Sequence, residues 1–191
     1  MESVPRKSNW FRIILVLLVV FAVVAVVAPT WFGPPTWAKS NMCMSNLRQV
    51  GFAVMLYADD HNGRLPRAAN WCDAIGHRMA HIAKPLQEVL TCPSLPRGEI
   101  GGYAFNSALS GAKWPGTVPS RTVVGFESSP GWNVHGGSKL LLKEPRHNNR
   151  LSFLFEDGHT QLLSGVATKR LVWDPALAVH SKQSRESGGR N

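Results

Sequence analysis

The sequence has no run of five or six like charges, and its basic residues are not interleaved with aromatic ones. The net charge of +9 is therefore diffuse, which argues against a nucleic-acid-binding surface. Charged residues make up only 17% of the chain and hydrophobic residues 44%, a balance that excludes wholesale disorder. The chain holds 17 glycines and 13 prolines, so we expect many loops rather than a helical bundle.

One long apolar run lies near the start of the chain. Residues 13–28 carry no polar side chain, and with the flanking aromatic residues the segment 13–32 can cross a bilayer. Basic residues precede it, so the positive-inside rule places residues 1–12 in the cytoplasm and the rest in the periplasm or outside the cell. A cleaved signal peptide is the alternative, because Val26-Val27-Ala28 offers small residues, but Pro29 disfavours cutting there. We therefore predict a retained single-pass anchor in the lipid bilayer.

Cysteine is scarce, with only Cys43, Cys72 and Cys92, and no two of them form a C-x₂-C pair. That absence argues against a zinc site. Outside the cytoplasm three cysteines predict one disulfide and one free thiol, and the sequence leaves all three pairings open.

The rest of the chain predicts helices followed by strands. Apolar residues recur at alternating four- and three-residue spacings over 38–59, which is typical of an amphipathic helix packed on a domain. Short strands are expected at 122–126 and 139–142, and a hairpin at 151–163 around a type I′ turn at Asp157-Gly158. The predicted fold is α+β: a transmembrane helix, then an amphipathic helix packed on a small antiparallel β-sheet. The folded domain is expected over 38–176, and a disordered tail over 177–191.

Four segments together resemble the bacterial pseudopilin-like proteins that carry a C-terminal H-X9-DG motif and are related to the major pseudopilin of type II secretion. The matching residues are Cys43, Asn46, Leu47 and Gly51 in the helix, then Cys92-Pro93, then Asn106, and finally His147 followed after nine residues by Asp157-Gly158. The resemblance implies a pilin-like fold in which these residues are structural. It also implies a non-enzymatic role, with other pseudopilins or secretion components as partners.

The sequence departs from this family at the prepilin signal. Counting back from Pro29, the family's Gly-Phe pair falls on Lys7-Ser8, and its glutamate falls on Arg12. The resemblance therefore leaves two expectations, a component of a type II secretion or type IV pilus-like system, or a relative that does not assemble. An alternative of a different class is an exported envelope domain that binds a polyanionic partner through the +9 charge.

His147 and Asp157 invite a catalytic interpretation, but no nucleophile or second base stands at a supporting spacing. We expect instead that Asp157 builds the turn and that His147 satisfies backbone groups beside the hairpin. An EF-hand loop aligned on Gly63 would place Ala58 and Ala69 at two essential ligand positions. We therefore expect no catalytic residue, no cofactor and no metal site, with calcium, which related major pseudopilins bind, left open.

Overall fold

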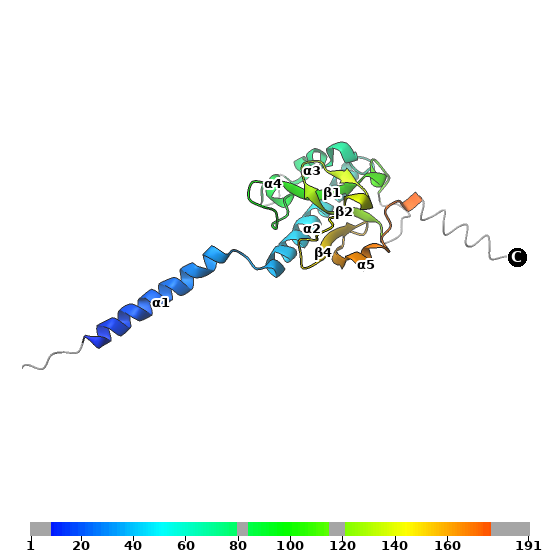
Figure 1. Ribbon diagram of the computed structural model, residues 1–191. Helices are drawn as coiled ribbons and strands as arrows, with labels where there is room; N and C mark the ends of the chain where they lie inside the picture. Colours follow the sequence, from blue (N-terminus) through cyan, green and yellow to red (C-terminus); the bar gives the residue numbers. More distant parts are fainter. Residues whose placement is uncertain (1–8, 80–83, 115–120, 177–191) are drawn as a thin grey trace, which may run out of the picture. The chain divides into compact units, whose positions relative to one another are not determined.

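The computed structural model describes residues 9–79, 84–114 and 121–176, and the chain divides into two compact units at residue 35 (Figure 1). Within its described residues, the first unit contains one helix, α1 (Trp10–Phe32). The predicted tail at 177–191 lies outside the described residues, as does most of the predicted cytoplasmic segment 1–12.

Helix α1 confirms the predicted apolar helix and begins a few residues earlier than expected. Its large apolar side chains are exposed, Phe21 by 73% and Val26 by 75%. The stretch Trp10–Ala28 is long and apolar enough to cross a membrane, a property that anchors and signal sequences share.

The second unit begins with α2 (Thr36–Asp60), which confirms the predicted amphipathic helix. The apolar residues at helical spacing form its buried face. The turn that follows α2 closes at Gly63, whose φ of +73° is left-handed and whose N–H donates to the Ala58 carbonyl at 2.7 Å. α2 contacts strands of the sheet and two short helices, α3 (Trp71–Met79) and α4 (Leu86–Val89).

The sheet has five strands in the order β3-β1-β2-β4-β5. Their bounds are β1 Gly101–Asn106, β2 Val123–Pro130, β3 His135–Gly136, β4 Arg150–Phe155 and β5 Thr160–Ser164. Single turns of helix stand before, between and after the strands, namely η1 Ala68–Asn70, η2 Ser107–Leu109, η3 Ser138–Leu140 and α5 Gly165–Thr168.

The sheet is mixed, whereas we predicted a purely antiparallel one. After β2 the chain passes to the far side of β1, where the short β3 pairs in parallel. Trp71 Nε1 and the N–H of Phe105 both donate to the Val134 carbonyl, at 2.9 and 3.0 Å. These long-range contacts decide the pairing, and no local pattern encodes them. The prediction of a strand at 139–142 is also wrong, because that segment forms η3 and a loop.

The predicted hairpin exists, but its turn differs from the predicted one. β4 and β5 pair antiparallel, and the loop between Phe155 and His159 holds three residues. Gly158 has a φ of +82°, whereas Asp157 is not in the left-handed region, so a type I′ turn is excluded. A three-residue loop with one left-handed glycine fits the geometry instead.

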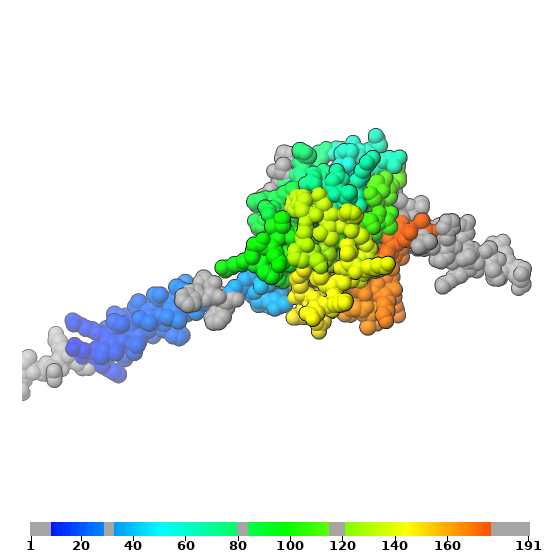
Figure 2. All heavy atoms as spheres, turned by 45° about the horizontal axis from the view of Figure 1, so that its top comes forward, coloured from blue at the N-terminus to red at the C-terminus, as the bar shows by residue number. Residues whose placement is uncertain are grey.

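Two apolar clusters fill the two faces of the sheet. One lies between the sheet and the helices α2 and α3. The other lies on the opposite face, where Phe126 and Phe153 pack against Trp173. The segment around residues 130–150, yellow in Figure 2, forms part of the surface of this unit.

Candidate functional site

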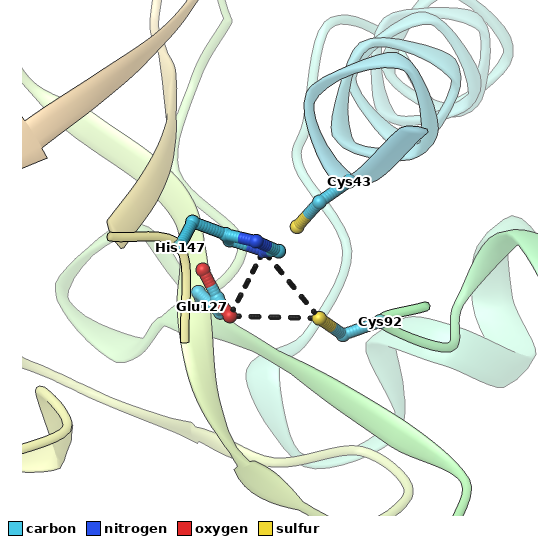
Figure 3. A group of neighbouring side chains, drawn as sticks. All are labelled: Cys43, Cys92, Glu127 and His147. Atoms are coloured by element: carbon cyan, nitrogen blue, oxygen red, sulfur yellow. Dashed lines mark hydrogen bonds and ion pairs between the residues drawn. The ribbon is translucent and has the colours of Figure 1, made fainter. Parts of the chain in front are cut away.

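Four polar side chains meet inside the second unit, and we call them the buried cluster: Cys43, Cys92, Glu127 and His147 (Figure 3). They come from α2, from the segment after α4, from β2 and from the turn before β4. One sulfur, oxygen or nitrogen atom of each lies within 4.8 Å of those of the others. Each residue is at most 1% exposed, so the cluster is closed to bulk solvent.

The contacts within the buried cluster form a triangle. Cys92 Sγ donates to Glu127 Oε1 at 3.5 Å and lies 3.7 Å from His147 Nε2. His147 Nε2 lies 3.3 Å from the same carboxylate oxygen. Cys43 closes the group from the helix side, and the hydroxyl of Tyr103 donates to its sulfur at 3.3 Å.

The two cysteines are brought together by contacts between α2 and the segment after α4. Cys43 lies on the buried face of α2, and Asn46 on the next turn donates to the Thr91 carbonyl at 3.2 Å. Cys92 follows directly, and its N–H donates to the Gly101 carbonyl at 2.8 Å. A Cβ at Gly102 would lie only 3.0 Å from Cys92 Cβ, so glycine permits this close approach.

His147 is placed by a tight turn. Its carbonyl accepts a hydrogen bond from the Arg150 N–H at 3.1 Å. The two residues between them, Asn148 and Asn149, have φ values of 51° and 59°. Two left-handed central residues are the mark of a type I′ turn, and asparagine tolerates that conformation well. A type I′ turn, which we predicted at Asp157-Gly158, is therefore found before β4, whereas the turn at Asp157-Gly158 has the three-residue geometry.

Glu127 is held from both sides. Its Oε2 accepts a hydrogen bond from the Ser152 N–H at 3.2 Å. Arg146 Nη1 lies 3.3 Å from Oε1 and also donates to the Ser128 carbonyl at 2.9 Å. These contacts fix the carboxylate orientation and give the buried cluster one cationic neighbour.

The protonation of the buried cluster is strongly perturbed. Burial raises the pKa of Cys43 well above its usual range. The hydrogen bond from Cys43, aided by His147, outweighs burial and lowers the pKa of Cys92 to about 4. Burial and the neighbouring Cys92 raise the pKa of Glu127 to about 7. The donor atoms of the site suit a divalent transition metal or, with loss of the Glu127 and His147 contacts, a disulfide.

The structure brings together three residues that the sequence analysis named separately, the two motif cysteines and His147. It also adds Glu127, which that analysis missed. The signal was present, because Glu127 is the one charged residue of β2 and directly follows the apolar stretch 123–126. The expectation that His147 satisfies backbone groups is wrong for its side chain: Nε2 faces the cluster, and Nδ1 has no hydrogen-bond partner among the described residues.

Other named residues lie elsewhere and act within the fold. Cys72 stands apart, where its sulfur accepts a hydrogen bond from the Asn133 N–H at 3.4 Å. All three cysteines are free thiols in this structure, and the predicted disulfide stays a prediction. In the segment considered for calcium, the Asp60 carboxylate forms an ion pair with Arg78. Asp157 accepts from the His159 N–H at 3.1 Å, as a turn-forming residue does.

The candidate site is therefore defined by the positions of its four polar side chains and by their burial. The chain matches no family model, no curated protein and no solved structure.

Proposed function

We propose that the chain is a membrane-anchored, pseudopilin-like structural protein whose folded domain lies in the periplasm or outside the cell. The observation that carries the proposal is α1, a helix with an exposed apolar surface that belongs to a unit of its own. Its N-terminal side would lie in the cytoplasm, because the basic residues precede it.

The dimensions of α1 support a span. Its 23 residues cover about 34 Å at the helical rise, against a hydrocarbon core about 30 Å thick. Trp10 at its first position suits the membrane interface, where its ring can meet the headgroups. Insertion into a lipid bilayer removes this apolar surface from water, which is favourable.

A structural role for the domain is supported by what the motif residues contact. Asn46 joins α2 to the segment before Cys92, and Gly51 lets α2 approach Leu154 of β4 closely. Asn106 bonds to two carbonyls from distant parts of the chain. Each of these residues holds helix and sheet together. The buried cluster is closed to solvent, so a substrate would have no access to it.

Arg12 bears on assembly. It stands where the resembling family has the glutamate that supports subunit register in a filament. A cation at this position removes that interaction, so we propose a tethered protein that does not depend on filament assembly. The alternative of polyanion binding has only the net charge of +9 behind it.

The test is fractionation of the full-length, tagged chain. We expect it in the membrane, resistant to alkaline carbonate and released by detergent. The double variant Val19→Arg, Val20→Arg places two charges in the apolar helix and should abolish membrane retention. Phe52→Arg is the matched control, because Phe52 is an exposed apolar residue of α2 in the other unit. Recovery of the unaltered chain in the soluble cytoplasmic fraction would refute the proposal.

N-terminal sequencing of the detergent-extracted chain separates an anchor from a processed pseudopilin. An intact Met1 end is expected. An end after Lys7 would show prepilin processing and would contradict the non-assembling form.

A further inference from the structure

We propose that the buried cluster binds one Zn²⁺ ion with four protein ligands, as a structural site that fastens α2 to the sheet. The ligand atoms are two cysteine sulfurs, one carboxylate oxygen of Glu127 and Nε2 of His147.

The separations between these atoms fit a tetrahedron. Zinc lies about 2.3 Å from thiolate sulfur and about 2.0–2.2 Å from imidazole nitrogen and carboxylate oxygen, so tetrahedral ligands stand about 3.3–3.8 Å apart. The three edges that join Cys92, Glu127 and His147 measure 3.5, 3.7 and 3.3 Å. The fourth corner, Cys43 Sγ, lies within 4.8 Å of the other three atoms. A small inward movement of one side chain would complete the tetrahedron.

The charges balance when zinc is bound. Two thiolates and one carboxylate carry three negative charges, and Zn²⁺ reduces this to one. Arg146, whose guanidinium lies 3.3 Å from Glu127 Oε1, supplies the remaining positive charge. Zinc binding requires two thiolates, a carboxylate and a neutral imidazole, so any proton that these four groups carry is released to solvent and no buried charge is left uncompensated.

The groups around the cluster also orient its ligands. The Ser152 N–H and Arg146 hold the carboxylate, and the Tyr103 hydroxyl donates to the Cys43 sulfur. Hydrogen bonds of this kind fix ligands in metal sites.

Zinc accounts for the whole set better than the two other occupants that the donor atoms suggest. A Cys43–Cys92 disulfide would use two of the four residues and would leave Glu127 and His147 buried without their sulfur partner. Calcium prefers ligands that are all oxygen, and here two of four are sulfur. Four protein ligands leave no open position, so the expected role of the ion is structural.

Sequence separation explains why no zinc motif marks this site. Glu127 lies 35 residues from Cys92, and His147 lies 55 residues from it. A search for C-x₂-C pairs finds only sites whose ligands come from one local loop.

The test uses the full-length chain, extracted in mild detergent without reductant. Elemental analysis should find one zinc per chain. After chelation, added Co²⁺ should give the intense visible bands of a tetrahedral ion and a thiolate-to-cobalt band in the near ultraviolet. Cys92→Ser should lower bound zinc at least ten-fold. Cys72→Ser is the matched control, since Cys72 is equally buried but outside the cluster, and it should keep one zinc.

A second variant guards against misfolding. Arg146→Met removes a group that orients Glu127 without touching the metal, so zinc affinity should fall about ten-fold while stoichiometry at saturation stays at one. If Cys92→Ser fails to fold, the cobalt spectrum of the unaltered chain still decides. Absence of zinc together with no tetrahedral cobalt spectrum after reduction would overturn the proposal. So would a mass two daltons lower with a peptide linking Cys43 to Cys92. Neither result depends on whether α1 is a membrane anchor.

Discussion

Asn106 should be one of the most sensitive polar positions in the fold. It stands at the end of β1 and is 1% exposed. Its Nδ2 donates to the carbonyls of Val123 and Trp173 at 2.7 and 2.8 Å, and its Oδ1 accepts from the Ala108 N–H at 3.1 Å. One side chain therefore joins β1, the start of β2 and the C-terminal segment.

The cost of Asn106→Ala follows from these three bonds. A buried hydrogen bond contributes about 1 kcal/mol net, and each partner left unpaired costs about 1–3 kcal/mol. The variant should therefore lower the free energy of unfolding by about 3 kcal/mol. With an m-value of about 2 kcal/mol/M, the urea midpoint should fall by about 1.5 M. Asn106→Asp should be worse, because a carboxylate oxygen would face two carbonyls, and its cost should grow as pH rises and the acid ionises.

The assay is urea unfolding of the full-length chain in mild detergent, followed by fluorescence of its tryptophans. Asn70→Ala is the control, because Asn70 is exposed at the end of a single helical turn. That control should shift the midpoint by less than the error of the fit. A shift below about 0.5 M for Asn106→Ala would mean that water replaces the lost bonds, and would refute the bridging role.

Three further predictions test other contacts. Gly51→Val should destabilise the domain by about 1–3 kcal/mol, because a Cβ there would meet Leu154 Cδ1 at 2.7 Å. In a double-mutant cycle in urea, Leu154→Ala should lower the free energy of unfolding less in the Gly51→Val chain than in the unaltered chain. Gly158→Ala should cost about 1–2 kcal/mol because its φ is +82°, whereas Gly165→Ala, with open space around its Cβ position, should be near neutral in the same thermal melts. Burial raises the pKa of Cys72 to about 12, so its thiol stays protonated at pH 8. Its alkylation, followed by mass spectrometry, should therefore be far slower in the folded chain than in the urea-unfolded chain, and equal rates would contradict its burial.

The helices could be predicted because their signals are periodic and local. α1 follows from an unbroken apolar run, and α2 from apolar residues at helical spacing. β4 and β5 follow from alternation on either side of an Asp-Gly pair. The parallel β3 could not be predicted, because two residues give no pattern and their pairing depends on contacts with Trp71 across the fold.

The site could be predicted only in pieces. Cys43, Cys92 and His147 each stood out by residue type, but nothing local states that they meet. The missing residue, Glu127, has its signal in the apolar stretch that precedes it in β2, because a buried carboxylate must have polar partners. The sequence does not identify those partners, since they lie 19 or more residues away along the chain.

The spacing of nine residues between His147 and Asp157 is a structural length. It contains two turn residues, Asn148 and Asn149, the six residues of β4, and Glu156 as the first residue of the loop. The ends of a six-residue strand lie about 20 Å apart, so the histidine and the aspartate do not act on one substrate atom. His147 belongs to the buried cluster, and Asp157 belongs to the loop of the hairpin. An insertion of one residue in β4 would turn its side chains to the opposite faces and would move Ser152 and Phe153 away from their partners. The spacing is therefore set by the register of this strand.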